Sequence, residues 1–201
     1  PWEAVQPGYT IDVVAQGLQL PCGIAFAPNQ SALATAPKFY VSELYGTIKV
    51  VTNSGLMADY ATNVLNYTPS GAFPGSGEQG LADIAIDPVT GDLFVSHLWM
   101  TNGQTFPRIT RYSSTNGGLT ASSSQVILDM VGESQGQSHQ ISNMEIVNGE
   151  LFCHMGDGFQ PNTAQNLTSY RGKILRLNLD GTPIPSNPWY NGGTLDARDY
   201  I

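Results

Sequence analysis

A pattern of β-type residues recurs along the chain at an interval of 60 residues. Its three copies, GIAFAP, DIAIDP and NMEIVN, begin at Gly23, Asp83 and Asn143. Each is followed by turn residues and then by further β-like runs, whose alternating side chains are typical of half-buried strands. The runs lie at 39–43, 93–97 and 151–155, then at 47–51, 108–112 and 173–177, and finally at 56–60 and 125–129. A sheet of four antiparallel strands cannot bury both of its faces alone, so neighbouring copies must pack together.

Serial four-stranded antiparallel sheets are the blades of a β-propeller, and this all-β fold is the predicted class. A β-sandwich is the alternative, but it does not explain the same strand order at a fixed period. We expect one partial propeller domain over 1–201, with blades at 18–62, 78–130 and 138–182 and with 183–201 leading into the next blade. Because 201 residues cover only about three to three and a half blades, we expect a fragment, or a ring completed by a second chain or by self-association.

Composition narrows the classes of function. The 41% hydrophobic and 12% charged content fits a folded globule. A net charge of −8 with only 8 Lys and Arg argues against nucleic acid as a partner, and the absence of a long apolar run argues against a membrane span. The many Gly and Pro residues, and a start at Pro1 without a leader, predict a processed protein that is secreted or periplasmic. Cys22 and Cys153 could pair, although unpaired thiols in core strands are the favoured interpretation.

Polar residues stand at equivalent places before the three repeats. Gln19, Gln79 and His139 each lie four residues ahead of an anchor, where the innermost strand of a blade would open onto the central channel. We therefore expect the three side chains to converge. A neutral histidine there can act as a proton acceptor, and a loop residue that only satisfies a carbonyl is an equal alternative. His97 and His154, inside strands, are expected to be buried and hydrogen-bonded. Lys173 is expected to face solvent.

Four motifs carry a resemblance to a known family. They are GEQGLADIAIDP at 77–88, Ser138-His139, LFCHMGD at 151–157 and GKILRLNLDG at 172–181. In this order they resemble the soluble glucose dehydrogenases and glucose/sorbosone (aldose sugar) dehydrogenases that depend on pyrroloquinoline quinone (PQQ). The resemblance implies a six-bladed propeller, with the quinone across the top of the channel and calcium in the active site.

The resemblance also implies roles for individual residues. His139 is the expected catalytic base, Gln79 contacts sugar and quinone, Asp157 is a pocket carboxylate and Gln160 is a further pocket glutamine. None of them is expected to ligate metal, because the family's quinone-binding cations and calcium-binding carbonyls belong to its later half. Ser138 stands where soluble glucose dehydrogenase has an Asp, so the preferred sugar is left open.

These features predict a quinoprotein that oxidises the anomeric hydroxyl of an aldose to the lactone, with hydride transfer to PQQ. Its partners would be a small sugar and an electron acceptor. A non-catalytic propeller that binds carbohydrate or protein is the alternative. A calcium-dependent lactonase ranks last, because the three equivalent positions hold Gln, Gln and His instead of carboxylates.

Overall fold

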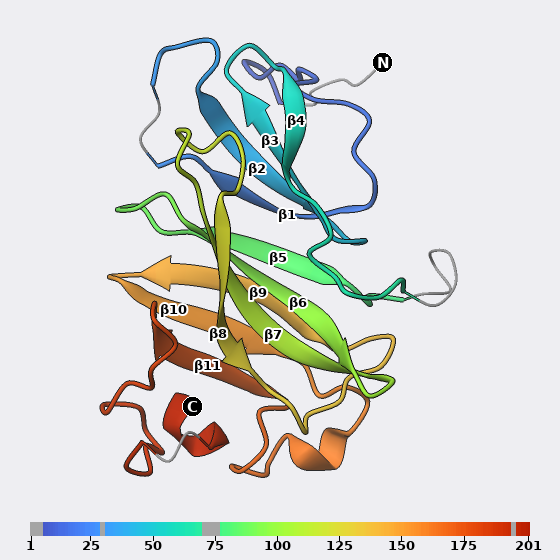
Figure 1. Ribbon diagram of the computed structural model, residues 1–201, viewed down its shortest axis with the longest axis vertical. Coiled ribbons are helices and arrows are strands. Elements are labelled where there is room, and N and C mark those ends of the chain that lie inside the picture. The colour runs from blue at the N-terminus through green and yellow to red at the C-terminus, as the bar shows by residue number, and fades with distance from the viewer. Residues whose placement is uncertain (1–5, 29–30, 70–76, 194–195) are drawn as a thin grey trace.

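The computed structural model describes residues 6–28, 31–69, 77–193 and 196–201, and these form three antiparallel sheets side by side (Figure 1). The first sheet contains β1 (Pro21–Phe26), β2 (Pro37–Glu43), β3 (Thr47–Thr52) and β4 (Met57–Ala61) in that order. The second contains β5 (Leu81–Ile86), β6 (Leu93–Thr101), β7 (Gln104–Ser113) and β8 (Ser123–Asp129). The third contains β9 (Ile141–Val147), β10 (Glu150–Met155) and β11 (Lys173–Asn178).

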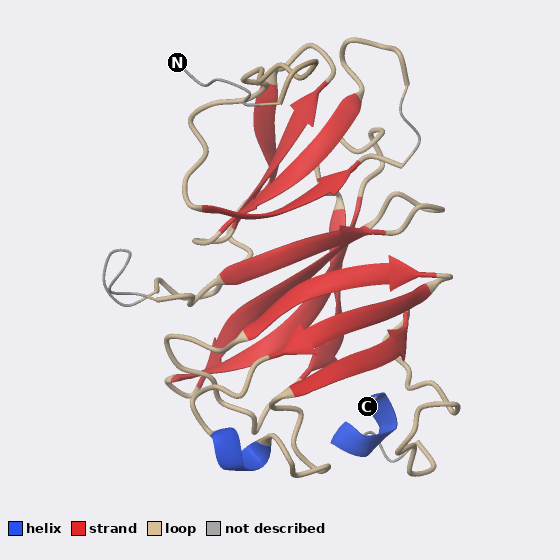
Figure 2. Ribbon diagram, turned by 180° about the vertical axis from the view of Figure 1, so that it is seen from behind, coloured by secondary structure: helices blue, strands red, loops and turns tan. Residues whose placement is uncertain are grey.

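The innermost strands of the three sheets reproduce the period of the sequence. β1, β5 and β9 begin at residues 21, 81 and 141, and β5 lies between the other two. Each sheet extends from its innermost strand by hairpins. This is the radial arrangement of propeller blades, so the predicted fold class is confirmed. The third blade has an isolated bridge between Leu177 and Pro183 in place of a fourth strand. Two short helices, η1 (Pro161–Thr163) and η2 (Ala197–Tyr200), lie at the far end (Figure 2).

Strand β6 supplies buried side chains to both interfaces of the middle blade. Leu93 and Val95 belong to the hydrophobic cluster shared with the first blade, whereas Phe94 and Leu98 belong to the cluster shared with the third. Successive side chains of a strand point to opposite faces, so the run LFV supplies both clusters at once. Each such buried side chain contributes about 1.5–3 kcal/mol.

A polar contact also joins the innermost strands of the blades. The buried Asp83 carboxylate in β5 accepts a hydrogen bond from the Met144 N–H of β9 at 2.8 Å. On its other side Gly23 of β1 lies so close that a Cβ there would stand 2.1 Å from Asp83 Oδ1. Burial raises the pKa of Asp83. The first, second and third blades therefore meet around one carboxylate.

Two sequence expectations are corrected. Cys22 and Cys153 are both free, as favoured, but Cys22 is exposed although core burial was expected for both. His154 is exposed, because side chains alternate along β10 and the buried Cys153 and Met155 take the core face on either side of it; it contacts Ser142. His97 is buried as expected. No helix in the described ranges is long and apolar enough to cross a membrane.

The buried His97 predicts a pH dependence of stability. Its ring nitrogens contact Leu98 O at 3.1 Å and Thr110 Oγ1 at 2.9 Å, and burial lowers its pKa from 6.5 to about 4. Between pH 4 and pH 6.5, His97 is protonated in the unfolded chain but not in the native chain. The free energy of unfolding should therefore fall by up to roughly 3 kcal/mol as the pH drops from 6.5 to 4.

Urea unfolding of wild type, His97→Gln and His154→Gln across this range measures the effect. The pH slope should flatten in His97→Gln and persist in the variant of the exposed His154. An unchanged slope in His97→Gln would contradict this assignment.

Candidate functional site

His139 is held in the loop before β9 by contacts with both neighbouring segments. Its N–H donates to Glu78 Oε2 at 2.9 Å, and its carbonyl accepts from the Gly158 N–H at 2.8 Å. The φ angle of His139 is +56°, a left-handed conformation that is uncommon for residues other than glycine. Such strain persists where the surroundings over-determine it, and it is common at functional sites.

The imidazole of His139 is paired with a carboxylate. His139 Nδ1 lies 2.7 Å from Asp157 Oδ1, and the same oxygen accepts from the Phe159 N–H at 3.0 Å. The hydrogen bond to His139 is the main reason that the pKa of Asp157 lies below its usual range. An ionised Asp157 requires the proton on Nδ1, which leaves the lone pair on Nε2. The pair is therefore arranged to accept a proton at Nε2.

An aromatic ring fixes the imidazole from one side. The Phe159 ring stacks on His139 with centroids 4.3 Å apart and planes at 29°. Phe159 also has a left-handed backbone, with φ of +62°, and its side chain is exposed. The stack restricts rotation of the histidine ring and places an apolar surface beside it.

The two paired residues line a cavity of about 540 Å³, which we call the histidine cavity. Lys173 at the start of β11 also lines it, and burial lowers the pKa of its ammonium group. Nζ donates to Ala164 O at 2.7 Å and to Arg171 O at 2.8 Å. The expectation of a solvent-facing Lys173 is wrong, because this side chain ties the loop after η1 to the strand.

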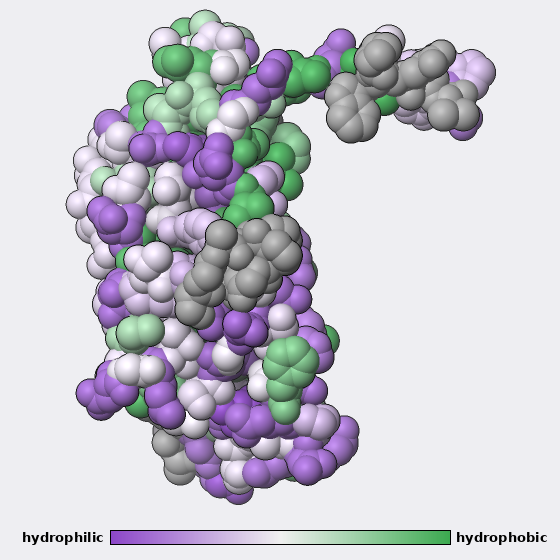
Figure 3. Space-filling model, turned by 90° about the vertical axis from the view of Figure 1, so that its right-hand side faces the viewer, coloured by the Kyte–Doolittle hydropathy of each residue, from purple (hydrophilic) through white to green (hydrophobic). Residues whose placement is uncertain are grey.

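Gln79 and Gln160 come together in a different place. They line a neighbouring cavity of about 370 Å³, which we call the outer pocket. Gln135 also lines it, and its Nε2 lies 3.4 Å from the His139 carbonyl oxygen. The outer pocket and the histidine cavity are thus separated by the His139 backbone and the turn at 156–159. Figure 3 views the side with these loops, where hydrophilic residues predominate in the lower part.

The structure thus groups the four predicted site residues as His139 with Asp157 and Gln79 with Gln160. Gln19 lines neither cavity; it is exposed and its N–H donates to Glu43 Oε1 at 2.6 Å. The expected convergence of the three equivalent positions is therefore wrong for Gln19. The contacts of Glu78 and Phe159 with His139 were not predicted from the sequence.

The signals for the two missed residues differ. Glu78 is adjacent to the predicted site residue Gln79, and its carboxylate could have been predicted to accept a hydrogen bond from a neighbouring loop. Nothing in the sequence marks the positive φ of Phe159, which results from the turn closing onto the His139 carbonyl.

A close backbone approach at Gly156 predicts a sensitive position. A Cβ there would lie 2.2 Å from the His139 carbonyl oxygen, so Gly156→Ala must displace the His139 loop or the turn. We expect a loss of about 1–3 kcal/mol in the free energy of unfolding. Gly136→Ala is the matched control, because its Cβ would meet no atom within 4 Å. Equal urea midpoints for the two variants would disprove the tight contact.

Comparisons with known proteins concern the sequence and the fold of the chain. An uncharacterized protein of Synechocystis sp. is 28% identical over 203 residues, a match that covers 94% of this chain and 48% of that protein. The solved structure of an oxidoreductase assigned as a glucose dehydrogenase from Thermus thermophilus has a TM-score of 0.72 at 24% identity, over 90% of this chain and 50% of that one. The PQQ-bound aldose sugar dehydrogenase of Streptomyces coelicolor has a TM-score of 0.67 at 23% identity, over 92% and 52%.

This chain spans about half the length of these relatives. The likeness to the solved structures concerns the fold, over 90% and 92% of this chain. The family model named "Glucose / Sorbosone dehydrogenase" matches residues 18–200, which include every blade and both cavities. The chain therefore belongs to the glucose/sorbosone dehydrogenase family of sugar oxidoreductases.

Proposed function

We propose that this chain supplies the proton-accepting side of a PQQ-dependent dehydrogenase that oxidises the anomeric hydroxyl of an aldose to the lactone. The observation that carries the proposal is the His139–Asp157 pair, with Nδ1 bound to the carboxylate and Nε2 left as the acceptor. Membership of the family and the PQQ in a similar solved structure support the cofactor.

His139 would act as the general base. An anomeric hydroxyl that hydrogen-bonds to Nε2 loses its proton to the imidazole as the C1–H bond breaks. The imidazolium that forms is stabilised by Asp157 at 2.7 Å. The quinone, when bound, supplies the acceptor for the hydride from C1, which leaves a C=O bond and hence the lactone.

Positioning would come from the stack and the loop contacts. Phe159 restricts the imidazole, and Glu78 holds the His139 backbone. Their role is to keep Nε2 aimed at the substrate, because proton transfer requires hydrogen-bond distance. Gln79 and Gln160 lie one turn away, in the outer pocket, and offer neutral amides to sugar hydroxyls.

The cofactor's charged groups find few partners in the described part of the chain. PQQ is anionic through its carboxylates, yet Lys173 Nζ is already bound to carbonyls, and Arg171 pairs with Glu133 at 3.0 Å. No group of three or more His, Cys, Asp or Glu side chains that could hold a metal ion occurs within the described ranges. The described residues therefore fit the sugar and its proton, and we propose that the groups that bind the quinone carboxylates lie in another part of the enzyme, in keeping with the double length of the relatives.

Activity measurements on His139→Ala and Asp157→Asn test the proposal. The chain, alone and continued beyond Ile201 by the second half of a related sugar dehydrogenase, is supplied with PQQ, calcium, an aldose and a reducible dye. We expect His139→Ala to lose at least about 100-fold in kcat, the usual contribution of a general base. Asp157→Asn should also lose activity, because its amide no longer fixes the Nδ1–H tautomer.

Gln125→Ala, at an exposed position of strand β8, is the matched control and should keep wild-type rates. Oxidation that continues at the wild-type rate in His139→Ala would disprove the role of His139.

A further inference from the structure

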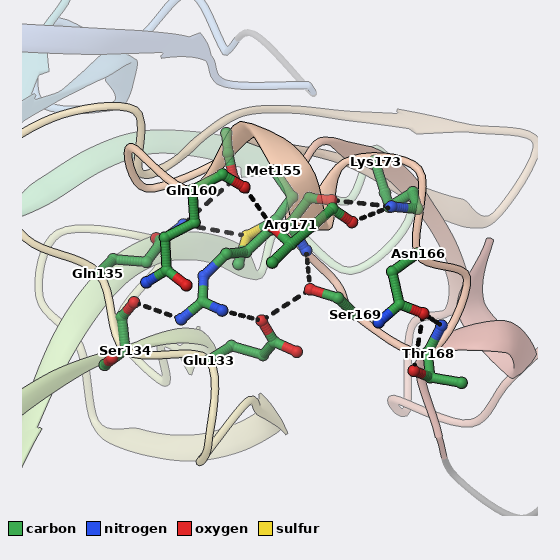
Figure 4. Close-up of polar contacts among 12 residues, drawn as sticks. Glu133, Ser134, Gln135, Met155, Gln160, Asn166, Thr168, Ser169, Arg171 and Lys173 are labelled. Atoms are coloured by element: carbon green, nitrogen blue, oxygen red, sulfur yellow. Dashed lines mark hydrogen bonds and ion pairs between the residues drawn. The ribbon is translucent and has the colours of Figure 1, made fainter.

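The loop that follows β8 is fastened to both the second and the third blade. On one side the Gln135 N–H donates to Thr105 O at 2.9 Å, and Thr105 Oγ1 donates to Gln135 O at 2.5 Å, which ties the loop to β7. On the other side buried Arg171 donates through Nη2 to Ser134 O at 2.6 Å, and its Nη1 pairs with Glu133 at 3.0 Å (Figure 4). The backbone of Gln135 is therefore held between the two blades.

The side chain of Gln135 extends from this loop to the segments around His139. Its Oε1 accepts a hydrogen bond from the Ile141 N–H at 2.8 Å. Its Nε2 lies 3.3 Å from Gly156 O and 3.4 Å from His139 O. One amide group thus contacts the His139 loop at two points and the turn at 156–159 at a third.

This amide suits its partners in polarity as well as in length. A glutamine side chain offers an acceptor oxygen and a nitrogen with two donors. Here the oxygen of Gln135 faces an N–H, and the nitrogen faces two carbonyls. Gln135 is only 3% exposed, so water cannot readily replace these contacts, and losing them leaves buried backbone groups without a partner.

The contacts of Gln135 also support a strained residue. His139 has a φ angle of +56°, and a residue in this region keeps its conformation only where its surroundings hold it. The distance of 2.7 Å from His139 Nδ1 to Asp157 Oδ1 requires the loop and the turn to stay together. Because Gln135 contacts both segments, its amide bears directly on that distance.

We propose that Gln135 is a positioning residue, which holds the His139 loop against the turn that carries Asp157 and so keeps the imidazole proton on Nδ1. It acts through His139 and takes no part in the proton transfer. Its importance for sugar oxidation rests on the proposed function, whereas its effect on the imidazole of His139 does not.

The Gln135→Met variant tests this role, because methionine has a similar length and cannot make the three amide contacts. By ¹⁵N NMR of the imidazole nitrogens, we expect the single Nδ1–H tautomer of His139 to become a mixture of the two tautomers. In the oxidation assay kcat should fall roughly 10- to 100-fold, as is usual when a catalytic group is misplaced by about 1 Å. Thr105→Val, which removes the hydroxyl that anchors Gln135, should change the tautomer in the same direction.

Ser96→Ala is the matched control, since it removes another buried contact between the second and third blades. Ser96 is fully buried, and its Oγ donates to Ser142 O of β9 at 2.8 Å. Both Ser96→Ala and Gln135→Met should lower the urea midpoint, and only Gln135→Met should alter the tautomer. A pure Nδ1–H tautomer in Gln135→Met would show that Gln135 only stabilises the fold, and would overturn the proposal.

The remaining outcomes also decide the matter. If Gln135→Met does not fold, Thr105→Val is read in its place, and an unchanged tautomer there overturns the proposal. His139→Ala separates this result from the proposed function. Oxidation at the wild-type rate in His139→Ala, with mixed tautomers in Gln135→Met, would disprove the general base and leave the positioning role intact.

Discussion

The packing of neighbouring blades face to face is the constraint on which the structure depends. The middle blade shows it most directly, because alternate residues of β6 enter the two hydrophobic clusters. Packing on both faces brings the innermost strands side by side, and the Asp83 carboxylate lies where all three meet. Since the strands are fixed in this order, the loops that precede them must open at one end of the blades. The candidate site is a consequence of that packing.

At that end the site is made by backbone contacts as much as by side chains. The carbonyl of His139 accepts from the Gly158 N–H, and Gly156 passes too close to it to carry a Cβ. These contacts bring Asp157 within 2.7 Å of Nδ1. The geometry thus links a strained loop, an ionised carboxylate and a free ring nitrogen. Each of these three features is ordinary by itself. Together they give a base whose proton-accepting nitrogen has a defined direction.

The period of 60 residues predicted the blades because hydrophobic alternation and turn residues are local properties of the sequence. It also located His139 before an inner strand, and the family resemblance identified Asp157. The division of the site into two cavities could not be predicted, because it depends on how the turn at 156–159 closes on the next loop. Lys173 was misjudged for a similar reason, since its strand position indicated exposure while its Nζ binds carbonyls of the loop that precedes the strand. Gln19 does not converge with the other two residues, because loops at equivalent positions of a sequence repeat can follow different paths.

The most direct test of the account is the tautomer of His139, measured by ¹⁵N NMR of the imidazole nitrogens in the 201-residue chain at neutral pH. The account predicts a proton on Nδ1 and none on Nε2, and a mixture of the two tautomers in Asp157→Asn. A proton on Nε2 in the wild-type chain would contradict it, because His139 would then have no lone pair facing the cavity and could not accept the proton of a sugar hydroxyl there.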